Sequence, residues 1–222
     1  MNRISVKFIL GVFCSVFLFV SNTYLVKAND EKNQYINNSI LQTFYNNKES
    51  VYILDEMGED VTDQFWNDTE LLYLTKDWNR IKDYILTNNL VLHKVLENKI
   101  VSDTRALNQY KTVVSEMFYF ILWDSNHATN MECSAELKGG IWYDVATDEV
   151  KRVSNTTLNI LEMGTNAIGV SLYTNDIQTS SSVVDGKGYF WAKCHFYGEN
   201  DDPIYKFYYD YGSKSLSFYA TP

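Results

Sequence analysis

The pattern of apolar and polar positions divides the chain into three parts. Residues 8–20 form an uninterrupted apolar run, residues 29–102 carry mainly helical periodicity, and residues 103–222 alternate as β-strands do. Such alternation places apolar and polar side chains on opposite faces of a strand. We therefore expect an α+β protein, with a mostly helical N-terminal region followed by a mainly antiparallel β-sandwich.

Thr62, followed by Asp63, is typical of a helix start. The clearest helical pattern lies in the next stretch, where Asp68 and Glu70 suit an N-terminal end and Asn88 and Asn89 end the periodicity. Between them a stripe recurs at spacings of three and four, which predicts one amphipathic helix. Residues 29–48 suggest a short helical lead, and the run LVLHKVL fits either a helical turn or a strand. The stripe consists of Leu71, Leu74, Trp78, Ile81 and Ile85.

After Thr104 the chain holds roughly seven to nine short β-branched and aromatic segments separated by turn signals, a spacing typical of a β-sandwich. Gly139 and Gly140 interrupt one segment, where we expect a bulge or tight turn. Near residue 190, one strand face is apolar throughout and is expected to join the core. That face carries Phe190, Ala192, Cys194 and Phe196, and the other carries Tyr189, Trp191, Lys193 and His195.

The N-terminus has the features of a signal peptide. Arg3 and Lys7 precede the apolar run, and Ala28 ends a stretch that suits signal-peptidase cleavage. The run is shorter than the roughly 20 residues of a membrane-spanning helix, although an uncleaved anchor is the alternative. We expect residues 1–28 to be removed and the mature chain to be secreted or held at the cell envelope, without membrane insertion.

The net charge of the chain limits the kinds of partner that it can bind. Cleavage removes three basic residues and no acidic one, so the net charge moves from −9 to −12. A chain this acidic is repelled by nucleic acid, which we exclude as a partner.

Cys133 and Cys194 remain after cleavage, and in an oxidising compartment such a pair predicts a disulfide. Two free buried thiols are one alternative. A catalytic thiol is another, but Cys194 and His195 are adjacent on a strand and point to opposite faces, so the base would have to be His127 or His93. The cysteine and histidine spacings do not fit a zinc site.

No nucleophile, metal or nucleotide motif is recognisable, so we assign no catalytic residue, no metal ligand and no cofactor. Five acids around Gly58 resemble a calcium loop only in composition, and a capped turn is the simpler interpretation. Whether the protein is an enzyme stays open, and the sequence favours a non-enzymatic role. Those acids are Asp55, Glu56, Glu59, Asp60 and Asp63.

The chain has 17 tyrosines, many of them in the C-terminal strands. Exposed aromatic side chains on a rigid sheet supply contact area at low entropic cost. Aromatic residues also fill sandwich cores, so the surplus alone does not define a site. We take as candidate binding residues Tyr205, Tyr208, Tyr209, Tyr211 and Trp191.

Two resemblances follow from these motifs. Cys133, Trp142 and Cys194, with the segment from Asp185 to Tyr189, are loosely similar to the Cys…Trp…Cys order and tyrosine corner of immunoglobulin-like sandwiches. The signal peptide, DEMGEDVTDQF and LKGGIWYDVATDEVKRV resemble small secreted β-sandwich proteins of Gram-positive bacteria. The second resemblance implies a location and a fold, but no activity.

The sequence therefore predicts a secreted, non-enzymatic protein that binds a protein or carbohydrate at the cell envelope or in the medium. A hydrolase with paired carboxylates is the first alternative, and a toxin or pore-forming protein is the second.

Overall fold

The computed structural model describes residues 38, 40–96, 99–101, 109–200 and 202–222, so the predicted signal peptide at residues 1–28 lies outside the described part. Residues 41–222 form one unit. Its elements, in chain order, are η1 (Lys48–Ser50), β1 (Val51–Leu54), α2 (Thr62–Leu74), α3 (Trp78–Thr87), β2 (Val91–Val95), β3 (Lys99–Val101), β4 (Gln109–Trp123), β5 (Asn130–Asp144), β6 (Glu149–Val153), β7 (Thr157–Thr165), β8 (Val170–Val184), β9 (Lys187–Asn200) and β10 (Tyr208–Ala220).

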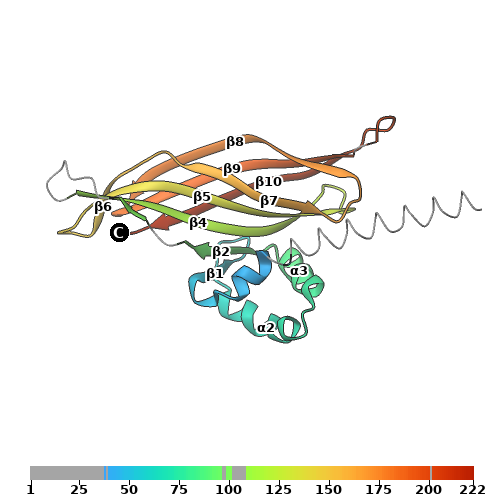
Figure 1. Ribbon diagram of the computed structural model, residues 1–222, viewed down its shortest axis with the longest axis horizontal. Helices are drawn as coiled ribbons and strands as arrows, with labels where there is room; N and C mark the ends of the chain where they lie inside the picture. Colours follow the sequence, from blue (N-terminus) through green and yellow to red (C-terminus); the bar gives the residue numbers. More distant parts are fainter. Residues whose placement is uncertain (1–37, 39, 97–98, 102–108, 201) are drawn as a thin grey trace, which may run out of the picture. The chain divides into compact units, whose positions relative to one another are not determined.

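Among the described residues, the strands form two sheets that face each other (Figure 1). The larger sheet runs β1-β2-β4-β5-β6, with β3 also paired to β4 and β7 to β5. The smaller sheet runs β10-β9-β8. Every pairing is antiparallel, which confirms the mainly antiparallel sandwich expected from the alternating pattern.

The core between the sheets is made by the inward faces of β4, β5, β9 and β10. The four residues predicted to form the apolar face of β9 are all buried there, which confirms that part of the pattern. Across from them, β5 contributes every second side chain, as the period of a strand requires. Those from β5 are Met131, Cys133, Ala135, Leu137 and Ile141.

The predicted bulge at Gly139 and Gly140 is wrong. β5 runs through both glycines, and they pair with Val114 and Val113 in the same register as the rest of β4. Gly139 is needed for space rather than for a turn, because the ring of Phe190 packs against it.

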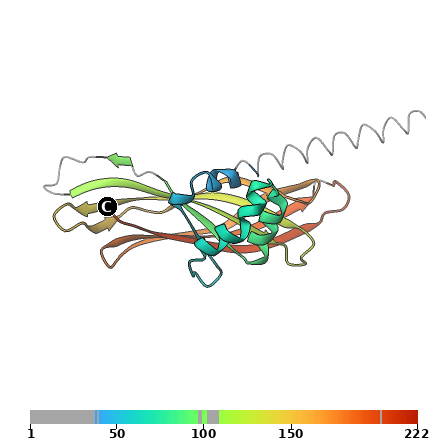
Figure 2. The same ribbon diagram turned by 90° about the horizontal axis from the view of Figure 1, so that it is seen from below.

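The N-terminal region is less helical than predicted. β1 pairs with β2, and β2 pairs with β4, so the run LVLHKVL is a strand and the region extends the larger sheet. Helices α2 and α3 lie on the face of that sheet turned away from the smaller sheet (Figures 1 and 2). Buried side chains between helices and sheet form a second core, which includes Phe44, Ile53, Phe65, Ile81, Ile85, Leu92 and Tyr119.

The predicted single helix is two helices. α2 ends at Leu74, and Lys76 adopts a left-handed φ of 58°, which breaks the helix before α3 begins. Asp77 caps α3 by accepting a hydrogen bond from the Arg80 N–H at 3.3 Å. The break splits the apolar stripe, since Ile81 and Ile85 are buried while Leu71 and Leu74 are 70% and 68% exposed.

No helix within the described ranges combines the length and the apolar character needed to cross a bilayer.

Candidate binding surfaces

A row of large side chains follows the outer face of β9. Since the inner face of this strand is buried in the sandwich core, the alternate residues point outward. The row extends over about 27 Å at the rise of an antiparallel strand. It consists of Tyr189, Trp191, Lys193, His195 and Tyr197.

Two rings of this row contact rings from the neighbouring strands. Tyr197 stacks on Tyr173 of β8, with ring centres 5.4 Å apart and planes 25° apart. The ring of Tyr189 packs against that of Tyr219 of β10, with ring centres 4.9 Å apart. The His195 ring is fixed from β10, since its Nδ1 lies 3.3 Å from the Ser213 hydroxyl and its Nε2 lies 3.3 Å from Asp210 Oδ1. These contacts hold the rings of Tyr189, His195 and Tyr197 in place on the sheet.

Small polar side chains flank the row on both sides. The register places Ser217, Ser215 and Ser213 of β10 beside Trp191, Lys193 and His195. On the other side, β8 places Ser182, Ser180, Gln178 and Asn175 beside Tyr189, Trp191, Lys193 and His195. Hydroxyl and amide groups both donate and accept hydrogen bonds. The outer face therefore presents apolar ring surface along its centre and exchangeable hydrogen-bonding groups along its margins.

The five aromatic residues predicted as binding residues do not form one site. Trp191 lies on the outer face of β9, while Tyr205 and Tyr208 are exposed at the β9–β10 connection. Tyr209 packs against the sandwich core. Tyr211 is buried, and its hydroxyl lies 3.1 Å from the hydroxyls of both Thr129 and Thr165.

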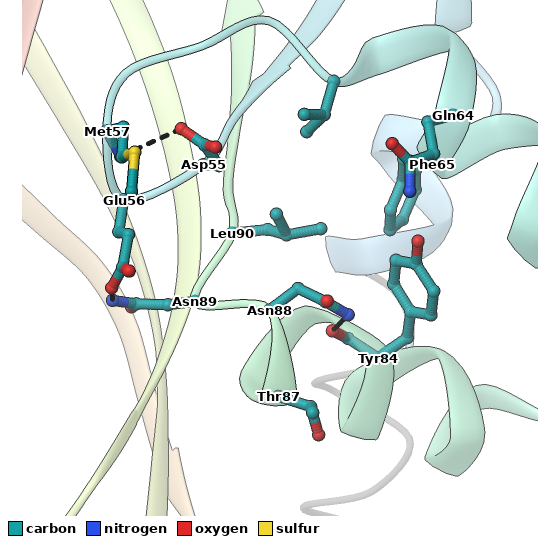
Figure 3. A pocket seen from close by; sticks show the side chains of 11 residues that line it. Asp55, Glu56, Met57, Gln64, Phe65, Tyr84, Thr87, Asn88, Asn89 and Leu90 are labelled. Atoms are coloured by element: carbon teal, nitrogen blue, oxygen red, sulfur yellow. Dashed lines mark hydrogen bonds between the residues drawn. The ribbon is translucent and has the colours of Figure 1, made fainter.

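A pocket of about 370 Å³ lies between the β1–α2 connection and the end of α3 (Figure 3). Phe65, Val61 and Leu90 supply its apolar part, and Tyr84 and Gln64 stand on the helix side. Asp55 and Glu56, two of the acids that the sequence groups around Gly58, line the opposite side (Figure 3).

Most polar groups of this pocket already have partners in the protein. Asp55 Oδ1 accepts hydrogen bonds from the backbone N–H groups of Met57 and Glu59, which closes the turn. Glu56 accepts from the Asn89 side chain at 3.2 Å (Figure 3). The Tyr84 hydroxyl points to Asp68, at 2.6 Å. These carboxylates hold the turn and helix end in place.

Of the remaining acids of this group, Asp63 lies in the first turn of α2, and Asp60 bonds within the turn that precedes this helix. Asp60 accepts from both the backbone N–H and the hydroxyl of Thr62, which lowers the Asp60 pKa. Over the described ranges, no three His, Cys, Asp or Glu side chains gather as a metal site requires.

No protein-family model matches this chain, and neither a curated protein nor a solved structure is detectably similar to it.

A carboxylate pair lies under α3, on the outer face of the larger sheet. Glu132 accepts a hydrogen bond from the Tyr119 hydroxyl at 2.9 Å and pairs with Lys82 of α3 at 3.0 Å. Burial, and to a lesser extent the charge of Glu132, raises the pKa of Glu162. Both Glu132 oxygens are thus occupied by protein partners, and Glu132 joins α3 to the sheet.

A second buried polar cluster lies on the inner face of the larger sheet. Glu116 Oε1 lies 2.6 Å from His93 Nδ1 and accepts a hydrogen bond from the Tyr52 hydroxyl at 2.5 Å. His93 and Glu116 are both buried, and the His93 ring packs between Tyr52 and Phe118. The sequence offered His93 only as a possible catalytic base, and the fold instead places it in a closed, fully packed position.

The predicted disulfide between Cys133 and Cys194 is absent. Both are free thiols buried in the sandwich core, Cys133 on β5 and Cys194 on β9. Burial raises the pKa of each thiol, and the nearby Cys194 raises that of Cys133 further. A thiol whose pKa is raised is a poor nucleophile, which also argues against the catalytic alternative. Trp142 lies on the same strand as Cys133 but on the opposite face, where Arg152 stacks on its ring at 3.9 Å.

Proposed function

We propose that the protein is a secreted binding protein that holds an extended carbohydrate chain on the outer face of β8, β9 and β10. The observation that carries this proposal is the row of rings along β9, three of them held by contacts with the neighbouring strands and the row bordered by serine, glutamine and asparagine. Binding of this kind needs no catalytic residue.

The chemistry of the face suits a sugar polymer. The C–H face of a sugar ring packs against the flat side of an aromatic ring, while its hydroxyls need hydrogen-bonding partners around the edge. Trp191 supplies the largest flat surface, and Ser180 and Ser217 stand beside it on the two neighbouring strands. A row that continues for about 27 Å favours a chain of several sugar units over a single small molecule.

A protein partner is less well supported by the same face. Protein interfaces concentrate their affinity in buried, desolvated clusters at the centre. Here Lys193 interrupts the ring row at its midpoint and is exposed. A sugar chain tolerates such a charge because its hydroxyls can accept hydrogen bonds from an ammonium group.

The test is binding of defined oligosaccharides by the full mature chain. Cello-oligosaccharides, chito-oligosaccharides and peptidoglycan fragments would be titrated while tryptophan fluorescence and heat are recorded. We expect one class to bind, and we expect Trp191→Ala and Tyr197→Ala each to weaken its binding by at least about tenfold.

Tyr205→Ala is the matched control, since Tyr205 is exposed but lies off this face. It should bind as the unmodified chain does. Equal affinity in Trp191→Ala, Tyr197→Ala and the unmodified chain would contradict the proposal. Mass spectrometry of the same mixtures would detect shortened oligosaccharides, the result expected of a hydrolase.

A further inference from the structure

The connection between β9 and β10 exposes an unusual concentration of apolar side chains. Ile204, Tyr205, Phe207 and Tyr208 are between 58% and 79% exposed. In Figure 1 this connection projects beyond the ends of the neighbouring strands. Large apolar side chains that face water at this density mark an interaction site.

Two further turns bring apolar groups to the same end of the sandwich. The antiparallel register places the β4–β5 turn, the β7–β8 turn and the β9–β10 connection together at this end. Trp123 borders the first turn and is 39% exposed, and Ile168 in the second is 71% exposed. The Ser125 N–H donates to the Asp210 carbonyl at 2.7 Å, which ties the first turn to β10.

Side chains within the β9–β10 connection pair several of its backbone groups. The backbone N–H groups of Ile204 and Tyr205 donate to Asp202 Oδ1 at 2.7 and 2.9 Å. Asn200 accepts from the Phe207 N–H and donates to the Tyr205 carbonyl, each at 2.7 Å. In a medium poor in water each unpaired backbone group costs several kcal/mol, so these hydrogen bonds lower the cost of moving the connection out of water.

We propose that this end of the sandwich docks on a lipid bilayer, with Ile204 and Phe207 entering the boundary between headgroups and acyl chains. Tyr205, Tyr208 and Trp123 have the amphipathic rings that concentrate at this depth. Lys206 can extend its ammonium group back toward water. The exposed Asp202 carboxylate limits penetration to this boundary, so the strands stay outside the bilayer.

Charge selects the kind of bilayer. The whole sequence carries a net charge of −9, and removal of residues 1–28 with their three basic residues makes the expected charge of the mature chain −12. An anionic membrane would repel it, so a zwitterionic phosphatidylcholine surface is the expected partner. Attraction then rests on the apolar side chains and should be nearly independent of salt.

The experiment measures co-sedimentation of the full mature chain with dioleoylphosphatidylcholine vesicles, at low and high salt. We expect binding that does not weaken with salt, and a loss of at least about tenfold in Ile204→Asp/Phe207→Asp. Met57→Asp is the matched control, because Met57 is 80% exposed in another turn. The control should bind as the unmodified chain does, and circular dichroism would verify that each variant is folded.

A second measurement tests how deeply the side chain at position 207 enters the bilayer. Tryptophan in a Phe207→Trp variant should shift its emission to the blue with vesicles and be quenched by lipids brominated near the headgroup. Trp191→Ala should keep its vesicle binding, which separates this proposal from the carbohydrate site. Failure of the folded chain to bind vesicles would overturn the proposal. It would favour a partner protein, with an apolar pocket, as the occupant of this end of the sandwich. Binding only to anionic vesicles, or equal binding by the double variant, would also overturn it.

Discussion

The ring of Phe190 fills the space that a side chain at Gly139 would occupy. A Cβ atom built on Gly139 of β5 would lie 2.0 Å from Cε1 of Phe190 on β9, far inside van der Waals contact. Phe190 also stacks on Phe218 of β10, at 5.1 Å between ring centres, so it cannot move aside freely. This contact sets the separation of the two sheets at this point.

Gly139→Ala is therefore expected to lower the free energy of unfolding by about 1–3 kcal/mol, the usual cost of overpacking a core. Urea denaturation followed by fluorescence would measure the change. Phe190→Leu in the same chain should recover part of the loss, because the smaller side chain vacates the space. Lys138→Ala, at the exposed neighbouring position, is the control, and a similar loss there would contradict the explanation.

Removal of the Glu116 carboxylate should destabilise the protein strongly. Glu116→Ala leaves the buried His93 ring nitrogen and the half-buried Tyr52 hydroxyl without their shared hydrogen-bond partner, and each buried polar group left unpaired costs about 1–3 kcal/mol. Glu116→Gln should cost less, since the amide oxygen can still accept one hydrogen bond. Chemical denaturation at neutral pH would measure both.

Glu70→Ala on the exposed face of α2 is the control, with an expected change within about 0.5 kcal/mol. A Glu116→Ala variant as stable as the control would show that the cluster contributes little.

Asp124 should make the protein sensitive to acid. It is buried at the β4–β5 turn, where burial raises its pKa but hydrogen bonds from the backbone N–H groups of Thr129, Asn126 and Ala128 outweigh this and lower it. A pKa lowered by folding stabilises the native state above the pKa of the unfolded chain, near 3.9, and this stabilisation is lost as the pH falls through the folded value.

Asp124→Asn should therefore be less stable than the unmodified chain at neutral pH. As the pH falls from about 5 to 2, the free energy of unfolding of Asp124→Asn should decrease less than that of the unmodified chain. Thermal unfolding across this range would show it. Asp63→Asn at the exposed start of α2 controls for the loss of one charge. Parallel pH profiles for Asp124→Asn and the unmodified chain would contradict the assignment.

The two core thiols should be unreactive in the folded protein. Cys133 and Cys194 are expected to resist a thiol reagent under native conditions and to react together in denaturant, because the thiolate forms poorly in an apolar core. Intact mass should not change on reduction. A gain of two hydrogens on reduction would instead restore the disulfide that the sequence predicts.

The period-two alternation determined much of the sandwich by itself. It identified the buried face of β9 and the strand character of the chain after residue 109, because side-chain direction in a strand depends only on position along it. It also named the residues of the outer row, from Tyr189 to His195. The sequence did not show which residues lie beside this row, since Tyr173, Ser180 and Ser217 reach it only through the register of three strands.

Local pattern was misleading where a distant contact decided the outcome. The stripe from Leu71 to Ile85 has the spacing of one helix, yet the turn at Lys76 and the surface of the sheet divide it into two. Gly139 has the sequence signal of a bulge, but the glycine is required there because the ring of Phe190, 51 positions later in the chain, occupies the space of a side chain.

The sequence by itself determined the strand faces and the absence of recognisable catalytic motifs, because these depend on neighbouring residues. Only the tertiary structure decided that Cys133 and Cys194 remain unbonded, that His93 pairs with Glu116, and that β9 presents its rings between two rows of small polar side chains. Each of these depends on distances between residues far apart in the chain, and such distances are fixed by packing and strand register rather than by local periodicity.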